Sequence, residues 1–264
     1  MTELTVYQID AFANAVFKGN PAAVVPLQDW LPDDVLLNMA KEHNQSETAY
    51  FVPLPEEKYD YELRWFTTQE EVELCGHATL ASSYVIFNEL GHAGDTIRFK
   101  TRFAGDLAVT RNADLLILDF PAREPETASE SAHLASALNI AQKPLAVLRD
   151  VSKIYFVYDD AQTILSADPD FKALGSNWVC ITAPGTDTDF VSRFFTPGDG
   201  HEEDPVTGST HCTLTPYWAK RLGKTAMTAR QLSERGGFLK VELVNDRVKI
   251  AGHAVLYSKG RINL

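Results

Sequence analysis

The side chains best suited to chemistry gather in one stretch, residues 193–211, whose sequence is RFFTPGDGHEEDPVTGSTH. It combines aromatic residues, carboxylates, a Pro/Gly turn and hydroxyl groups, and the residues after it, 212–222, are predicted to form a helix. A loop of small and polar residues that opens a helix presents free backbone N–H groups, which bind anions. Asp204 lies just before this opening. The sequence therefore predicts an anion-binding site with a carboxylate beside it.

Two further titratable side chains lie at predicted loop tips. Glu47 follows a helix-to-strand break, where a side chain can enter a cleft, and His77 opens a predicted helix. A carboxylic acid that is shielded from water can have a pKa raised towards neutrality, which suits it for proton transfer. Glu47, His77 and Asp204 are therefore the candidates for acid–base chemistry. Each of them could instead be a solvated loop residue or a helix cap.

The sequence contains an internal repeat. Residues 63–81 and 192–210 align without gaps at an offset of 129 (193 − 64). The matched residues include Arg64 with Arg193, Phe66 with Phe195, Glu73 with Glu202, and Cys75 with Asp204. A second match lies downstream at an offset of 132 (237 − 105), beginning with Gly105 and Gly237. Two matches of the same type in the same order predict two structurally similar halves.

The repeat gives a domain prediction and a place for a ligand. The two α+β halves are expected at residues 1–120 and 121–264. If they face one another, two helix N-termini meet in a cleft, which is a natural ligand site. Backbone N–H groups around Gly76 and Gly208, with the hydroxyl of Ser209, would then hold a substrate carboxylate.

The elements that position these residues follow from hydrophobic periodicity and turn residues. Residues 59–65 alternate apolar and charged side chains, which is typical of a strand with one buried face. Residues 32–42 begin with Pro and two Asp, which favour a helix start. The other predicted strands are residues 5–12, 22–26, 48–52, 96–101, 107–111, 115–120, 145–148, 154–157, 179–182, 189–195, 239–244, 248–252 and 254–258. The other predicted helices are residues 77–90, 131–139, 161–174 and 212–222.

Composition excludes several classes of protein. The net charge of −12 over 264 residues leaves no clustered Lys and Arg for nucleic acid, and it argues against an anionic membrane surface. No apolar run approaches the roughly 18 residues that cross a bilayer, and the N-terminus does not read as a secretory signal. Three cysteines, Cys75, Cys180 and Cys212, cannot all pair. A reducing, cytoplasmic setting is therefore expected.

The same motifs contain residue types that could bind a metal ion. Cys75, His77, His211 and Cys212 are residue types that bind zinc. Their spacings, Cys-x-His and His-Cys, do not match the usual zinc patterns, so no metal is expected. The sequence has no glycine-rich phosphate loop or dinucleotide fingerprint, so no cofactor is expected either.

Five short motifs follow one another along most of the chain. They are DAF with GNPA at residues 10–22, NQSET at 44–48, LRWFT at 63–67, ELCGHAT at 73–79 and EDPVTGS at 203–209. With these motifs the chain resembles the PhzF-like isomerases of the phenazine biosynthesis family, which have the diaminopimelate epimerase fold. Thr68 departs from the family pattern, in which Pro is common after the first Phe-Thr.

The resemblance implies a fold, an activity and a set of site residues. Each half would be a strongly curved, barrel-like antiparallel sheet around a central helix. The protein would be a cofactor-independent isomerase, assembled as a homodimer, that moves a proton within a small carboxylate-bearing substrate. Glu47 would be the catalytic acid/base. With the helix-start donors named above, the expected substrate-binding residues are Gly76, His77, Asp204, Gly208 and Ser209.

One position distinguishes the chain from the epimerases that share this fold. Those enzymes use two cysteines, one from each half. Here Cys75 fills the first place and, in the ungapped alignment, Asp204 fills the second. A pair of thiols is therefore not expected to act. Two alternatives stay open at this point: a binding protein for small acids that has no turnover, and a racemase that depends on Cys75.

Overall fold

The chain forms two compact units. The structure is a computed structural model that describes residues 2–54, 58–129, 131–198 and 201–264. Unit 1 comprises Met1–Phe120 with Ile250–Leu264, and unit 2 comprises Pro121–Lys249. The sequence had assigned residues 250–264 to the second half, and this assignment is corrected. The last strand, β18 (Ala254–Asn263), pairs antiparallel with β1 (Glu3–Ala11), from Ala11↔Ala254 to Glu3↔Asn263.

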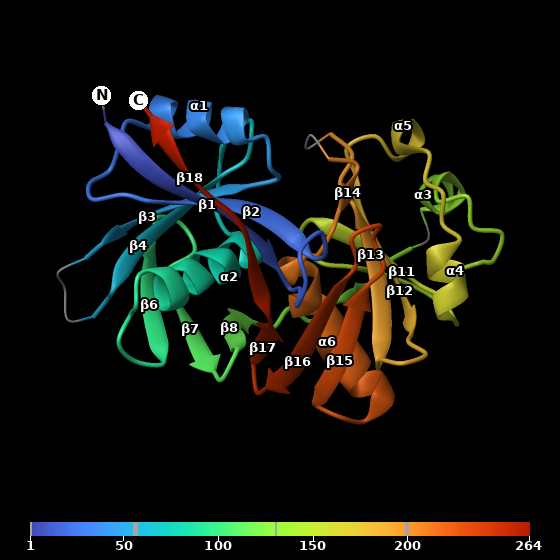
Figure 1. The fold of residues 1–264 in the computed structure, drawn as a ribbon. Helices are drawn as coiled ribbons and strands as arrows, with labels where there is room; N and C mark the ends of the chain where they lie inside the picture. Colours follow the sequence, from blue (N-terminus) through green and yellow to red (C-terminus); the bar gives the residue numbers. More distant parts are fainter. Residues whose placement is uncertain (1, 55–57, 130, 199–200) are drawn as a thin grey trace. The chain divides into compact units, whose positions relative to one another are not determined.

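Unit 1 is a mixed sheet with one central helix (Figure 1). Its remaining strands are β2 (Asn20–Pro26), β3 (Thr48–Pro53), β4 (Tyr61–Phe66), β5 (Glu71–Val72), β6 (Thr96–Thr101), β7 (Asp106–Asn112) and β8 (Leu115–Pro121). Most neighbours pair antiparallel, as predicted. The pairs β2–β3 and β4–β6 are parallel, because a helix connects the two strands of each pair.

The central helix of unit 1 is α2 (Gly76–Tyr84), which is continued by a π-helical segment, η1 (Val85–Glu89). Residues 76–83 are all buried, and α2 contacts β1, β2, β3 and β18. A helix that is enclosed on all sides needs partners for its polar side chains. The hydroxyls of Thr79, Ser82 and Ser83 donate to the backbone carbonyls four residues earlier. These internal bonds let a helix rich in small polar residues form part of the core.

Helix α1 (Asp33–His43) brings the chain to the first predicted catalytic residue. It packs Leu36, Met39 and Ala40 against the sheet and ends at Asn44. The backbone of Asn44 is left-handed, with φ of 50°, and its N–H donates to the carbonyl of Ala40. The chain then turns directly into β3. Glu47 is the last residue before that strand.

Unit 2 has its own mixed sheet (Figure 1). Its strands are β9 (Glu126–Thr127), β10 (Ala146–Arg149), β11 (Lys153–Val157), β12 (Trp178–Pro184), β13 (Phe190–Phe195), β14 (Glu203–Asp204), β15 (Ala226–Gln231) and β16 (Gly237–Val244). Strand β17 (Arg247–Gly252) begins in unit 2 and ends in unit 1. The helices are α3 (Ala132–Ala137), α4 (Ala161–Leu165), α5 (Phe171–Leu174) and α6 (Gly208–Leu222).

Two helix predictions in unit 2 are corrected. The single helix expected at residues 161–174 is split into α4 and α5, and Pro169, which has no N–H to donate and disfavours a helical residue before it, lies between them. Each of the two helices begins with its own Asp cap, Asp160 and Asp170. Helix α6 begins at Gly208, four residues before the predicted start at residue 212.

The two units repeat one another in detail. Arg64 makes a two-pronged ion pair with Glu71 and lies over the ring of Phe66, at 5.0 Å from its centre. Arg193 makes the same pair with Glu203 and lies 5.0 Å from the ring centre of Phe195. The directions of the strand pairs match as well. From β2 to β7 the successive pairs are parallel, antiparallel, antiparallel, parallel and antiparallel, and the pairs from β11 to β16 follow the same sequence.

The ungapped alignment of the repeat is wrong after its first few residues. Phe66 pairs with Glu71, whereas Phe195 pairs with Glu203, so the second turn is three residues longer (8 − 5). The central helices begin at Gly76 and Gly208, an offset of 132 (208 − 76), which equals the offset of the downstream match. Cys75 therefore corresponds to Thr207 and not to Asp204. Each of these two residues is the N-cap of its central helix.

None of the helices in the part of the chain that the structure describes has the length and apolarity needed to cross a bilayer.

Candidate active site

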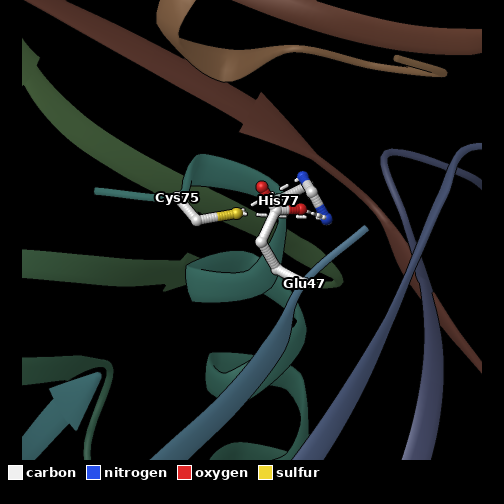
Figure 2. A group of neighbouring side chains, drawn as sticks. All are labelled: Glu47, Cys75 and His77. Carbon is white, nitrogen blue, oxygen red and sulfur yellow. Dashed lines mark hydrogen bonds and ion pairs between the residues drawn. The ribbon is translucent and has the colours of Figure 1, made fainter. Parts of the chain in front are cut away.

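Three side chains of unit 1 converge at the start of α2 (Figure 2). Glu47 comes from the end of the α1–β3 turn, Cys75 caps α2, and His77 is the second residue of that helix. The Oε2 atom of Glu47 lies 3.2 Å from Nε2 of His77. The sulfur of Cys75 lies 3.5 Å from Nδ1 and 3.9 Å from Nε2 of the same ring. The structure thus brings together Glu47 and His77, which the sequence had singled out separately.

Two residues that the sequence had assigned no role hold the ring of His77. The amide Nδ2 of Asn20, at the start of β2, lies 3.0 Å from Nδ1, and the hydroxyl of Ser46 lies 3.4 Å from Nε2. Ser46 also donates to the amide oxygen of Asn20 at 3.4 Å. Both residues lie inside the GNPA and NQSET motifs, so the signal was present in the sequence. These contacts fix the orientation of the imidazole that faces Glu47.

The charges at this site are set by burial and proximity. Burial lowers the pKa of His77, but a hydrogen bond to the Cys75 sulfur and the negative charge of Glu47 outweigh it and hold that pKa well above 6.5. Burial raises the pKa of the Cys75 thiol to about 11, and the charge of Glu47 adds to this shift. Cys75 is therefore a neutral thiol near pH 7. The Glu47 side chain keeps 20% of its surface exposed, whereas that of His77 keeps 5%, so Glu47 is the less enclosed of the two.

A second group of predicted residues lies at the start of α6 in unit 2. Thr207 donates from its hydroxyl to the carboxylate of Asp204. Gln231, buried on β15, accepts from the backbone N–H of Thr207 at 2.9 Å and donates to the carbonyl of Asp204 at 2.7 Å. Nothing in the sequence pointed to Gln231, because its strand carried no recognised pattern. Gln231 fixes the backbone that leads from Asp204 into the helix.

Gly208 and Ser209 are the first two residues of α6. Gly208 is buried and Ser209 is half-buried. Among the described residues the hydroxyl of Ser209 has no hydrogen-bond partner, so it is available to a ligand. The first turn of a helix also directs its free N–H groups outward. Gly76 has the same position at the start of α2. Whether one substrate engages both groups stays a prediction.

This chain lacks the second cysteine of the two-thiol epimerases. The residue in its place is not Asp204, as the ungapped alignment indicated. The residue equivalent to Cys75 is Thr207, whose hydroxyl is already bonded to Asp204. Cys75 itself is buried and protonated near neutral pH. A racemase acting through Cys75 would need a thiolate. The geometry therefore favours Glu47 over Cys75 as the proton carrier.

His211, which the sequence had considered as a metal ligand, lies in the core of unit 2. Its Nδ1–H donates to the carbonyl of Thr207 at 2.7 Å, its Nε2 has no hydrogen-bond partner among the described residues, and its ring lies against Phe190. Burial lowers the pKa of His211 to about 4. A neutral imidazole with one unpaired nitrogen is a structural residue that resists protonation.

This burial predicts acid sensitivity. The pKa of His211 is below its unfolded value of 6.5, so the contribution of the neutral ring is complete above pH 6.5 and is lost as the pH falls towards 4. The free energy of unfolding should fall by up to about 3.5 kcal/mol across this window ((6.5 − 4) × 1.4). His211→Asn keeps a donor near Nδ1 but does not titrate. Urea unfolding between pH 7 and 4.5 should show a shallower pH slope for the variant, and equal slopes would contradict this account.

The comparisons with known proteins are consistent over the whole chain. The family model described as phenazine biosynthesis-like protein matches residues 9–260. An uncharacterized isomerase of Pseudomonas aeruginosa is 47% identical, over 99% of this chain and 100% of that protein. The crystal structure of a phenazine biosynthesis protein of the PhzF family from Enterococcus faecalis is 44% identical, with a TM-score of 0.94, and all of both chains is covered.

A more distant structure bears on the fold alone. The crystal structure of a hydroxyproline epimerase from Agrobacterium vitis, with bound trans-4-hydroxy-L-proline, has a TM-score of 0.61 at 10% identity. It covers 98% of this chain and 92% of that chain. Together with the two α+β units, this likeness confirms the epimerase-like fold class predicted from the motifs.

Proposed function

We propose that this chain, which belongs to the phenazine biosynthesis-like protein family, is an isomerase that moves a proton within a small carboxylate-bearing substrate. The observation that carries the proposal is the pairing of Glu47 with His77 at 3.2 Å at the opening of a buried helix. The relative from Pseudomonas aeruginosa that is 47% identical bears the name isomerase, which supports the same class of reaction.

The proposed mechanism is general acid–base catalysis by one carboxylate. The Glu47 carboxylate takes a proton from a carbon of the substrate, and the electron pair of that C–H bond moves into the adjacent π system. The resulting carboxylic acid then returns the proton to a different carbon of the same π system. No electrons are gained or lost overall, and Glu47 ends as the carboxylate. His77 holds Glu47 in place through Nε2, and Asn20 and Ser46 hold His77.

The substrate carboxylate needs donors, and the helix starts supply them. We assign this role to the N–H groups at Gly76 and Gly208 and to the hydroxyl of Ser209. Asp204 would accept from a donor group on the substrate, with Thr207 keeping its carboxylate oriented. Assembly as a homodimer is part of the same proposal, and light scattering would test it.

Hydrogen exchange at carbon tests whether turnover occurs. The protein is incubated in D2O with a panel of small unsaturated amino and hydroxy acids, and NMR follows their C–H signals. The proposal expects deuterium at carbon in at least one acid, in proportion to protein concentration. Binding without exchange for every acid would favour the non-catalytic alternative. Exchange that is abolished by Cys75→Ser, but kept by Glu47→Gln, would favour the Cys75-dependent racemase.

A further inference from the structure

The three converging side chains of unit 1 have a chemistry that proton transfer does not use. Carboxylate, thiolate and imidazole are the three ligand types of zinc sites in proteins. One ligand atom from each of Glu47, Cys75 and His77 lies within 4.8 Å of the other two. Figure 2 shows the sulfur, the ring and the carboxylate turned towards one another. We propose that these three residues form a Zn²⁺ site, and that the bound ion inhibits proton transfer at Glu47.

The distances fit a tetrahedral ion. With Zn–N and Zn–O bonds of about 2.0–2.2 Å and a Zn–S bond of about 2.3 Å, tetrahedral ligands lie about 3.3 Å (N to O) and about 3.6 Å (N to S) apart. The distance between Nε2 of His77 and Oε2 of Glu47 is 3.2 Å, and the distance between Nε2 and the Cys75 sulfur is 3.9 Å. The first distance is about 0.1 Å below the tetrahedral value and the second is about 0.3 Å above it.

The groups around Glu47, Cys75 and His77 are compatible with a bound metal ion. A metal-binding histidine donates its second ring N–H to an acceptor, and the side-chain amide of Asn20 lies 3.0 Å from Nδ1 of His77, where its oxygen would accept this N–H if the amide turned over. One Zn²⁺ with the Glu47 carboxylate and the Cys75 thiolate is electrically neutral, so the buried site gains no net charge. Three protein ligands leave the fourth position of a tetrahedral Zn²⁺ for water or a substrate carboxylate.

The spacing of the sequence could not reveal this site. Cys-x-His is not a usual zinc pattern, and the third ligand, Glu47, comes from a different element. His211 and Cys212, the other residue types considered, lie along α6 in unit 2, where the Cys212 sulfur donates to the carbonyl of Gly208. Cys212 is therefore a matched control: it is a buried cysteine of the same chain that is no part of the site.

Zinc binding and proton transfer exclude one another at this site. Zn²⁺ takes the carboxylate oxygen that must accept the substrate proton and the ring nitrogen that holds that carboxylate. Binding also releases the Cys75 proton to solvent. Protons therefore compete with the ion for the ligands of this site. This inference rests on the three side chains and not on the identity of the reaction.

Cobalt spectroscopy tests the site directly. The full chain is freed of metal with a chelator and titrated with Co²⁺. We expect one equivalent to give the near-ultraviolet band of a cobalt–thiolate bond and strong visible bands of a tetrahedral ion, both bleached by Zn²⁺. Cys75→Ser should lose the thiolate band, and Cys212→Ser should keep it. The absence of bands with millimolar Co²⁺, or a thiolate band that persists in Cys75→Ser, would overturn the proposal.

A second variant guards against misfolding of the cysteine replacement. The partly exposed Glu47→Gln keeps the size of the side chain and should fold like the wild type, which circular dichroism would verify. Its Zn²⁺ affinity, measured by competition with a chromophoric chelator, should fall at least about tenfold. An unchanged affinity would contradict the role of Glu47 as a ligand. Failure of zinc binding would leave the exchange assay with metal-free protein unaffected, so the two proposals fail separately.

Discussion

Glu47→Gln is expected to lower kcat for any substrate identified in the exchange screen by about 10²–10⁴-fold, with little change in thermal stability. That range is the usual contribution of a positioned acid/base group. Glutamine preserves the shape and can still contact Nε2 of His77, but it cannot take up and return a proton. The stability effect should be small because glutamine keeps the size of the side chain and a polar oxygen beside His77.

The control for this variant is Glu42→Gln, the same substitution on the exposed face of α1, one turn before the site. It should leave kcat within experimental error of the wild type. Steady-state kinetics on both variants, with Tm values alongside, separate loss of the acid/base group from loss of fold. Equal losses in the two variants, or less than a tenfold loss in Glu47→Gln, would contradict the assigned role.

Gly19→Ala is expected to destabilise the protein by on the order of 3–5 kcal/mol and to lower kcat as well. Gly19 has φ of +66°, and a Cβ there would lie 2.1 Å from the backbone oxygen of Ala11 and 2.8 Å from the Cβ of Ala13. A backbone atom cannot rotate aside, so the β1–β2 connection must shift. The next residue is Asn20, which holds the ring of His77. Urea unfolding and kcat are the two measurements.

Gly91→Ala separates crowding from backbone conformation. Gly91 has a similar φ of +71°, but a Cβ there would meet nothing within 4 Å. Its substitution should lower the free energy of unfolding by about 1–2 kcal/mol, because alanine disfavours the left-handed conformation, and should leave kcat unchanged. A loss of stability at Gly19 no larger than that at Gly91 would show that the close approach to Ala11 is relieved without strain.

Much of the fold was predictable from local patterns. The alternation in residues 59–65 and the Pro-Asp-Asp start of residues 32–42 gave β4 and α1 within two residues at each end. The repeat gave two similar units. Its register was not predictable without gaps, because the three extra residues lie in the turn after Phe195, where side chains carry no periodic signal. The pairing of β18 with β1 joins the two ends of the chain, and local pattern carries no information on such a contact.

The site was predictable in its residues but not in its geometry. Glu47 and His77 lie in recognisable motifs, yet they are 30 positions apart (77 − 47), and only the fold shows that their side chains meet. For Cys75 the sequence left one possible role, in a Cys75-dependent racemase. The structure places its sulfur beside the same ring, where it can bind a metal although it is not suited to proton transfer.

The most direct test of the central claim is deuterium incorporation at carbon in D2O, measured side by side for wild type and Glu47→Gln at equal protein concentration, after removal of metal. If Glu47 carries the proton, the wild type places solvent deuterium in the isomerised product, and the variant places none above the uncatalysed rate over many hours. Wild-type rates of incorporation in Glu47→Gln would contradict the claim and would require a different proton carrier.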